Sequence, residues 1–544
     1  MASYPGADAP GFTLSPASQA AIPKSAIGNR KSEIGNVMKA LDLIIIFGYL
    51  IGIVVFGTWF GRKQETTKDY FLGDRSVPWW AVAFSIVATE TSTITFISVP
   101  GIAFARGGNF QFLQLVFGYL LGRVVISLLF IPSYFRGELM TVYQLLDRRF
   151  GGKIKMLAAS LFVVMRNIAD GIRLLLTAIV LAAVYVSFQP TANVETITIV
   201  SVVLIGLAML VFTYFGGMEA VIWVEVVQLG IYIAGALAAA LVLISSINGG
   251  LATANSLALQ YGKYSLFDFS LDFTKTYTFW SGLLGGCFLT MSTHGTDQYL
   301  VQRYLCTDRP RRAVVALLTS GGIVLAQFIG FLFIGVLLFA FYRPFASPEY
   351  ATAASTAFPF TGGDRVFPDF ITQHLPTGLS GLVVAAIFAA AMSSSLNSIA
   401  ATAVNDLYKP FKPNRDDKHY LKVSHVLTLI WGIVQIGVAL IARNQAGSAL
   451  SQALSIASLI NGPVLGVFLV GTFLRRVSQP PALIGMLASI AAMLYVFFAT
   501  KIAWTWYVLL GSLITLVVAW VASFAFSPAP ESMRDELAPV VSQE

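Results

Sequence analysis

Residues 85–101 read SIVATETSTITFISVPG. Hydroxyl side chains crowd around one acid, Glu90, and the pair Pro100 and Gly101 follows. The stretch lies inside a longer apolar segment, residues 79–105. Proline removes a helical hydrogen bond, and irregular backbone at membrane depth is tolerated only where it is buried in protein or lines a cavity. The stretch therefore predicts a helix that is interrupted inside a membrane.

The composition of the whole chain agrees with a membrane protein. Of its 544 residues, 56% are hydrophobic and only 11% are charged, whereas soluble domains carry about 25% charged residues. No polar linker separates domains between residues 40 and 526. The net charge is +8, and the positively charged residues lie in short loops between apolar segments. These features exclude a soluble enzyme, a disordered scaffold and a nucleic-acid-binding protein.

Thirteen apolar segments are each long enough to cross the roughly 30 Å of hydrocarbon in a bilayer. Several are uninterrupted, which favours helices over barrel strands, so we expect an all-α integral membrane protein. The predicted spans are residues 41–61, 79–105, 110–135, 155–187, 195–214, 218–247, 276–302, 312–342, 377–407, 421–442, 448–474, 481–499 and 504–526.

The loops predict the orientation in the membrane. One set of alternate loops holds twenty Lys and Arg residues and the other set holds seven, so the first set should be cytoplasmic. Residues 1–39 would then be a mobile tail outside, rather than a signal peptide, and residues 528–544 a cytoplasmic tail. The sequence has no Asn-x-Ser/Thr acceptor site, which favours a bacterial inner membrane. Two long outer connections, 248–275 and 343–376, are expected to carry short helices or gate-like loops.

A second polar interruption occurs five spans after the first. Residues 290–297 read TMSTHGTD within the span 276–302. This spacing is expected if five helices repeat in inverted order and a ligand binds at the two breaks. Ser and Thr in membrane helices also bond back to their own carbonyls, but that alternative explains single hydroxyls better than two clusters.

Charged side chains inside the spans are costly, so each is a functional candidate by default. Asp170 and Arg173 are three residues apart on one helix and can pair. Glu225 has no basic residue near it in sequence, so it would bind a cation, pair with a distant base or take up a proton. The full set comprises Glu90, Arg123, Arg166, Asp170, Arg173, Glu225 and Asp297.

Polar side chains of the ninth span point to a cation. Ser394 and Ser398 share a helix face, as do Ser393 and Asn397, and such oxygen donors suit a small hard cation. The sequence has no His/Cys cluster for zinc or copper, no phosphate-binding loop and no nucleophile elbow. An ATP-driven pump and an organic cofactor are therefore unsupported. His294 is the single candidate for intramembrane catalysis, and a lone buried histidine is usually structural, so we expect no enzyme.

Four strings of sequence, in order and on the predicted helices, resemble one family. They are FLGDRSVPWW (71–80), GGMEAVIWVEVVQ (216–228), DQYLVQR (297–303) and the run from AAAMSS (389–394) to NDLY (405–408). Together they resemble the sodium:solute symporters, which include carriers of sugars, proline, sialic acid, iodide and vitamins. The resemblance covers most of residues 40–525.

The resemblance implies a LeuT-like fold of two inverted five-helix repeats with discontinuous first and sixth core helices. The transporter domain would be residues 40–527, with repeats at 79–247 and 276–474 and peripheral helices at 41–61 and 481–526. It further implies a monomeric secondary active transporter of the plasma membrane. Such a carrier takes up a small polar solute together with Na⁺ by alternating access, and its partners are the solute, Na⁺ and the lipid bilayer.

The resemblance also implies a sodium site between the first and eighth core helices. An alternative register, aligned back from Asn405, would place Ala390 and Ala391 at the two hydroxyl positions and remove two oxygens. The first register has no gap up to Ser394 and is favoured. Its ligands are the carbonyls of Ala88, Thr91 and Ala390 and the hydroxyls of Ser393 and Ser394.

Glu90 and Glu225 stand where members of the family have acids close to sodium. The resemblance therefore implies a second cation site or a proton site at these two carboxyls. A proton-coupled or uncoupled carrier of the same fold would use them, and this is the alternative to Na⁺ coupling. A channel is less well supported.

The solute is the least determined part of the prediction. Arg173 lies near a position that contacts the solute carboxylate in sialic acid carriers, which favours a sugar acid or organic acid. If Asp170 neutralises Arg173, a neutral polyol or sugar-like solute is equally favoured. Thr293 stands where sugar carriers have an aromatic side chain, so a glucose-like solute is not supported. The candidate contacts are Thr95, Phe96, Gln111, Gln114, Arg173, Thr290, Thr293, His294 and Asn397.

Overall fold

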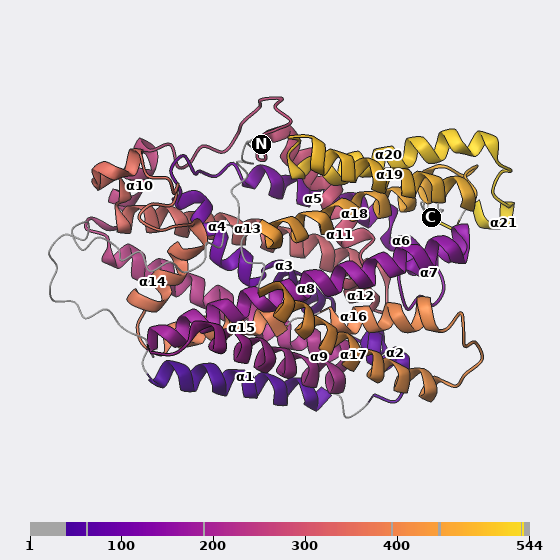
Figure 1. Ribbon diagram of the computed structural model, residues 1–544, viewed down its shortest axis with the longest axis horizontal. Coiled ribbons are helices and arrows are strands. Elements are labelled where there is room, and N and C mark those ends of the chain that lie inside the picture. Colours follow the sequence, from indigo (N-terminus) through magenta and orange to yellow (C-terminus); the bar gives the residue numbers. More distant parts are fainter. Residues whose placement is uncertain are drawn as a thin grey trace, which may run out of the picture.

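The computed structural model describes residues 40–60, 64–188, 191–392, 395–443, 448–534 and 536–537. Throughout these residues the regular elements are helices, and most long ones run side by side along the longest axis (Figure 1). In chain order they are α1 (Ala40–Phe60), α2 (Thr67–Leu72), α3 (Trp79–Glu90), α4 (Thr93–Phe104), α5 (Leu113–Leu129), α6 (Ile131–Tyr134), α7 (Tyr143–Phe150), α8 (Gly152–Phe188), α9 (Val194–Ser246), α10 (Gly250–Gln260), α11 (Gly286–Gly295), α12 (Gln298–Leu305), α13 (Pro310–Tyr342), α14 (Val366–His374), α15 (Leu379–Met392), α16 (Leu396–Thr402), α17 (Asp417–Ala442), α18 (Ser448–Phe473), α19 (Gln479–Ala499), α20 (Tyr507–Ala522) and α21 (Glu531–Arg534).

The first predicted break is present, and it lies in the hydroxyl cluster. α3 and α4 meet at an angle of 59°. The side chain of Ser92 accepts a hydrogen bond from the backbone N–H of Thr95 and so caps the start of α4. Pro100 lies inside α4, not at the break. A Cβ at Gly101 would lie 2.2 Å from the carbonyl oxygen of Gly363, so this glycine permits close contact with an outer connection.

The second predicted break separates α11 from α12. The carboxylate of Asp297 accepts a hydrogen bond from the backbone N–H of Tyr299 at 2.8 Å and caps α12. An acid at a helix start is favoured by the helix dipole. Both interruptions are thus formed by short polar side chains that satisfy the freed N–H groups of the following helix.

One long helix, α9, covers two predicted spans, 195–214 and 218–247. Its backbone leaves helical geometry at Gly217, with φ +60° and ψ −160°. A Cβ there would lie 2.7 Å from the carbonyl oxygen of Tyr70, so only glycine fits this turn between the two halves. The sequence pattern placed the boundary correctly.

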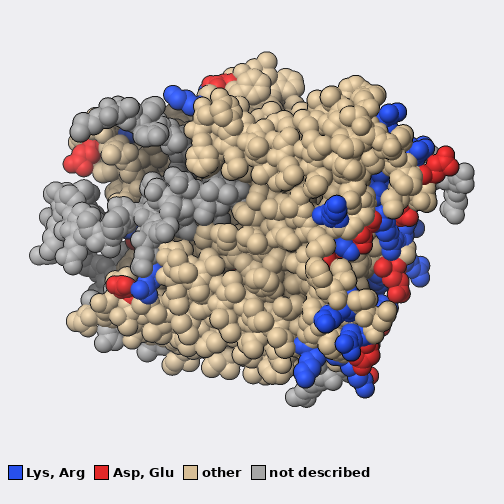
Figure 2. All heavy atoms as spheres, turned by 45° about the vertical axis from the view of Figure 1, so that its right-hand side comes forward, with Lys and Arg blue, Asp and Glu red and all other residues tan. Residues whose placement is uncertain are grey.

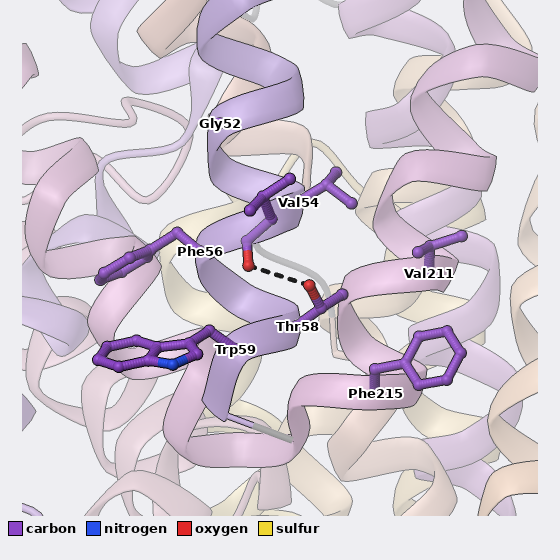
Figure 3. A pocket seen from close by; sticks show the side chains of 8 residues that line it. Gly52, Val54, Phe56, Thr58, Trp59, Val211 and Phe215 are labelled. Carbon is purple, nitrogen blue, oxygen red and sulfur yellow. Dashed lines mark hydrogen bonds between the residues drawn. The ribbon is translucent and has the colours of Figure 1, made fainter. Parts of the chain in front are cut away.

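The outer surface along the helices is apolar, as a bilayer requires. Six of the described helices are long and apolar enough to cross a membrane, or seven if the bent α3–α4 pair counts as one span. The full count of thirteen stays a prediction. A shallow groove of about 760 Å³ runs between α1 and α9, lined by Val54, Phe56, Trp59, Val211 and Phe215 (Figure 3). Its one nearby hydroxyl, Thr58, donates to the carbonyl of Val55, which leaves an apolar face suited to lipid chains.

Charged side chains gather at one end of the molecule, which we call the basic end (Figure 2). In Figure 1, α7, which carries Arg148 and Arg149, lies at this end, and the guanidinium of Arg149 donates to the backbone carbonyl of Arg475 at 3.3 Å. The opposite end carries the two long connections, which contain the short helices α10 and α14 as predicted (Figure 1).

Both long connections are tied to the C-terminal end of α4. The buried amine of Lys263 donates to the carbonyls of Ala103 and Ala105, at 3.0 and 2.6 Å. Arg106 donates to the carbonyls of Tyr350 and Ala351, at 2.7 and 2.6 Å. Burial lowers the pKa of Lys263 to about 7. The hydrogen bonds from Lys263 satisfy carbonyls that the end of α4 leaves without helical partners.

Candidate sodium and solute site

The two helix breaks place the predicted sodium ligands of the first core helix in the protein interior. Ala88 and Thr91 are both buried at the end of α3. The hydroxyl of Thr91 donates to the carbonyl of Val87 at 2.8 Å and to the side-chain oxygen of Gln327 at 2.7 Å. The backbone of Ala390 lies in α15, and Ser393 and Ser394 lie outside the described residues.

Glu90 lies at the first break and has two basic partners. Its carboxylate forms ion pairs with the guanidinium of Arg123 on α5 and with Nε2 of His294 on α11. Nδ1 of His294 is 2.9 Å from the hydroxyl of Thr293, and Nε of Arg123 is 3.4 Å from that of Ser320. The two breaks, α5 and α13 are therefore joined by one polar network.

Glu225 is fully buried and pairs with Arg303, which is also fully buried. Nη2 of Arg303 is 2.5 Å from the Glu225 carboxylate, and Nε is 3.0 Å from the hydroxyl of Ser85. The hydroxyls of Ser85 and Thr89 donate to the same carboxylate. This network joins α3, α9 and α12. Of the three alternatives for Glu225, the structure therefore shows pairing with a base that is distant in sequence, Arg303. Glu90 pairs in the same way with Arg123.

A third acid, Asp170, joins α8 to the start of α16. Its carboxylate lies 3.7 Å from the guanidinium of Arg173. It also accepts hydrogen bonds from the backbone N–H and the hydroxyl of Ser395, the first at 3.2 Å. The pair that the sequence allowed is therefore formed.

A cavity of about 130 Å³ lies between α8, α11, α12 and α18. The guanidinium of Arg166 borders it, 4.0 Å from the ring centre of Tyr299 and 3.8 Å from the carboxylate of Asp297. Nε of Arg166 has no hydrogen-bond partner among the described residues. The other polar lining residues are Tyr143, Ser292, Thr293, Thr296 and Asn461. Here an arginine faces a polar space beside the second break.

The candidate solute contacts divide into two groups. Thr95, Thr293 and His294 gather at the breaks around Glu90, since the hydroxyl of Thr95 donates to the carbonyl of Glu90 at 3.0 Å. Thr290 is buried on α11. Phe96 packs into an aromatic cluster with Tyr232, Phe331 and Phe367.

The remaining contacts hold other parts of the protein together. Gln114 is buried and bonds to the carbonyl of Tyr277 and the N–H of Asp268. Gln111 lies beside it and accepts from its side chain. Asn397 donates to the carbonyl of Tyr70 at 3.2 Å and accepts from Gln302 at 2.6 Å.

Sequence reasoning did not find the roles of Arg166, Arg303 and Asn461. Arg166 was noted as a charge within a span, and Arg303 ended one of the family strings. The usable signal was charge balance, because buried acids in spans need bases. Asn461 carried no signal, since a lone amide in an apolar helix is compatible with many packing roles.

Comparison with known proteins agrees with this fold. The sequence profile of the sodium:solute symporter family matches residues 70–489. The chain is 32% identical over 495 residues to a sodium/sialic acid symporter of Aliivibrio fischeri, covering 89% of this chain and 93% of the relative. A sodium/sialic acid symporter of Proteus mirabilis is 28% identical, covering 91% and 97%. The solved substrate-bound, outward-open structure of a Na⁺-coupled sialic acid symporter superposes with a TM-score of 0.79 at 27% identity, covering 91% of this chain and 99% of that one.

The chain belongs to the sodium:solute symporter family. It is a secondary transporter that couples the movement of a small solute to that of Na⁺, and Na⁺ is its co-transported ion. The predicted family and all-helical membrane fold are confirmed. The family is one of transporters, which points away from an enzyme, and these relatives do not favour proton coupling.

Proposed function

We propose that this symporter takes up a small carboxylate-bearing solute together with Na⁺. The observation that carries the proposal is the polar cavity beside the second break, where Arg166 presents a guanidinium. Two relatives are named sialic acid symporters, and sialic acids are sugar acids. Arg binds carboxylates through paired, charge-assisted hydrogen bonds.

Arg166 is a better carboxylate ligand than Arg173 in this arrangement. The guanidinium of Arg173 lies 3.7 Å from the carboxylate of Asp170, on the same helix, α8. That carboxylate also accepts a hydrogen bond from Ser395 at the start of α16. The guanidinium of Arg166 lies over the ring of Tyr299 and 3.8 Å from the carboxylate of Asp297, which also caps α12. The cavity is smaller than the roughly 300–1,000 Å³ of most ligand pockets, so α8 or α18 must move for a sugar acid to enter.

Replacing Arg166 by glutamine should raise the solute concentration for half-maximal uptake by about 10- to 100-fold. A charge-assisted hydrogen bond contributes about 1.5–3 kcal/mol, and about 1.4 kcal/mol corresponds to a factor of ten. The measurement is Na⁺-driven uptake of a labelled sialic acid, and of other sugar acids and organic acids, into proteoliposomes.

Two variants control this experiment. Arg173→Gln should change the apparent affinity less than Arg166→Gln does. Arg312→Gln removes an exposed charge, paired with Asp308 at 2.9 Å, and should have no effect. An unchanged apparent affinity in Arg166→Gln, with lost affinity in Arg173→Gln, would move the carboxylate site to Arg173.

For the sodium site we propose the carbonyls of Ala88, Thr91 and Ala390 and the hydroxyls of Ser393 and Ser394. Purified protein should unfold at a higher temperature in NaCl than in choline chloride of equal ionic strength, and Ser394→Ala should remove the difference. A ligand that binds only the folded state stabilises it by about 2.7 kcal/mol at 100 times its Kd. A midpoint that follows pH instead of Na⁺ would favour proton use through Glu90 and Glu225.

The same proposal includes the finer architecture. Thirteen spans would form two inverted repeats, 79–247 and 276–474, that alternate between outward- and inward-open states. The basic end would face the cytoplasm of a bacterial cell, with residues 1–39 outside and 528–544 inside. The protein would act as a monomer in the plasma membrane.

A further inference from the structure

The end of the α16 segment contains a buried carboxylate, Asp406, that forms no direct ion pair within the described part of the chain. α16 continues into a π-helical turn, Ala403–Tyr408, which packs against α8 and α17 near the basic end. Asp406 lies in this turn and is fully buried. One carboxylate oxygen accepts a hydrogen bond from the hydroxyl of Thr141 at 2.9 Å, and the other has no hydrogen-bond partner among the described residues.

The nearby bases are engaged elsewhere. Lys155 lies 2.5 Å from the carboxylate of Asp147. Lys409 sits over the ring of Tyr420, 4.6 Å from its centre. Across the described part of the chain, no cationic side chain lies within 4 Å of Asp406. A buried carboxylate in this situation is costly unless a proton or a cation neutralises it.

Two more buried oxygens on the same turn have no partner in the described structure. They are the hydroxyl of Thr402 and the side-chain carbonyl of Asn405. The amide nitrogen of Asn405 donates to the carbonyl of Ala401 at 2.8 Å, which fixes its oxygen as the free group. Thr402 and Asp406 are four residues apart and share a helix face. One carboxylate, one amide oxygen and one hydroxyl are hard donors of the kind that alkali and alkaline-earth cations prefer.

We propose that Asp406, Asn405 and Thr402 form a further Na⁺ site, separate from the one at the helix breaks. It lies about two to three turns beyond Ser395 along the same helical segment, toward the basic end. An ion leaving the breaks toward that end would bind here before it reaches water. The other groups facing this site are Thr141, Tyr143, Asp147, Lys155 and Lys409.

The test measures Na⁺ binding from each side of the membrane separately. Proteoliposomes with the full chain in one orientation take up solute at fixed external Na⁺, while internal Na⁺ is varied against choline. In Asp406→Asn, the internal Na⁺ concentration that halves uptake should rise about tenfold, and the external Na⁺ requirement should change less than twofold. Thr402→Val removes one ligand oxygen at nearly constant side-chain volume. It should raise the internal Na⁺ concentration that halves uptake about threefold.

Asp308→Asn is the control, because it removes a carboxylate that already has two basic partners, Arg309 and Arg312, and that is not among the groups facing Asp406. It should leave internal inhibition unchanged. Unchanged inhibition in both Asp406→Asn and Thr402→Val would overturn the proposal. So would equal changes in the external and internal requirements, or inhibition by internal acid that replaces inhibition by Na⁺. If Asp406→Asn does not yield folded protein, Thr402→Val decides the question.

Discussion

Replacing Arg303 by glutamine should be among the most damaging single changes in this protein. Arg303 and Glu225 are both fully buried, and their pair holds α3, α9 and α12 together. Removing one partner of a buried pair costs about 3–5 kcal/mol, because the other charge is left unpaired. Whole domains are stable by only about 5–15 kcal/mol. We expect a large fall in the apparent unfolding midpoint and in the yield of monodisperse protein.

A double variant separates charge from packing in this result. Glu225→Gln combined with Arg303→Met leaves no buried charge, so most of the lost stability should return. Arg309→Gln removes an arginine from an exposed pair with Asp308 and should cost well under 1 kcal/mol. If Arg303→Gln were no less stable than Arg309→Gln, the buried pair would not be a stabilising contact.

The second large effect is expected at Arg123. Glu90 faces both Arg123 and His294, so Arg123→Gln leaves the carboxylate with the histidine as its only basic partner. Unless that histidine carries a proton, the buried charge of Glu90 is then uncompensated. We expect a loss of about 3 kcal/mol at pH 8.

This loss should shrink as the pH is lowered. A proton on the Glu90 and His294 pair would cancel the buried charge that Arg123→Gln leaves in the folded state, whereas in the unfolded chain that charge lies in water. The folded variant should therefore bind this proton more tightly than the unfolded chain does, and its stability should rise as the pH falls. Thermal unfolding of Arg123→Gln at pH 6 and pH 8, beside the unmodified protein, measures this. A variant in which His294 is also replaced by glutamine should lose most of the recovery at pH 6. An equal loss at both values would show that Glu90 does not depend on a base.

The helices and their two interruptions could be predicted because the signals are local. Apolar length fixes a span, and a capping residue fixes where a helix restarts, as Ser92 and Asp297 do. The boundary between the predicted spans 195–214 and 218–247 likewise falls at Gly217, where α9 leaves helical geometry. Pro100 was the weaker signal, since it lies within α4.

The partners of the buried charges could not be predicted from one sequence. Glu225 and Arg303 are 78 residues apart, and their contact depends on how α9 packs against α12. The same holds for Glu90 with Arg123, and for Arg166 with its cavity. Gln114 and Asn397 were predicted as solute contacts because polar side chains in spans often bind ligands. The structure uses both to join helices or connections instead.

The attachment of both long connections to α4 has a mechanical consequence. Lys263 binds carbonyls at the end of α4, and Arg106, which follows α4 directly, binds carbonyls of the other connection. Any movement of α4 must carry these connections with it, or exchange its carbonyl hydrogen bonds for water. Movement of α4 together with the connections keeps the hydrogen bonds of Lys263 and Arg106. The exposed connections and the buried helix break should therefore move together as one rigid unit. An antibody fragment that clamps the two connections together would then act on the ion site without touching it.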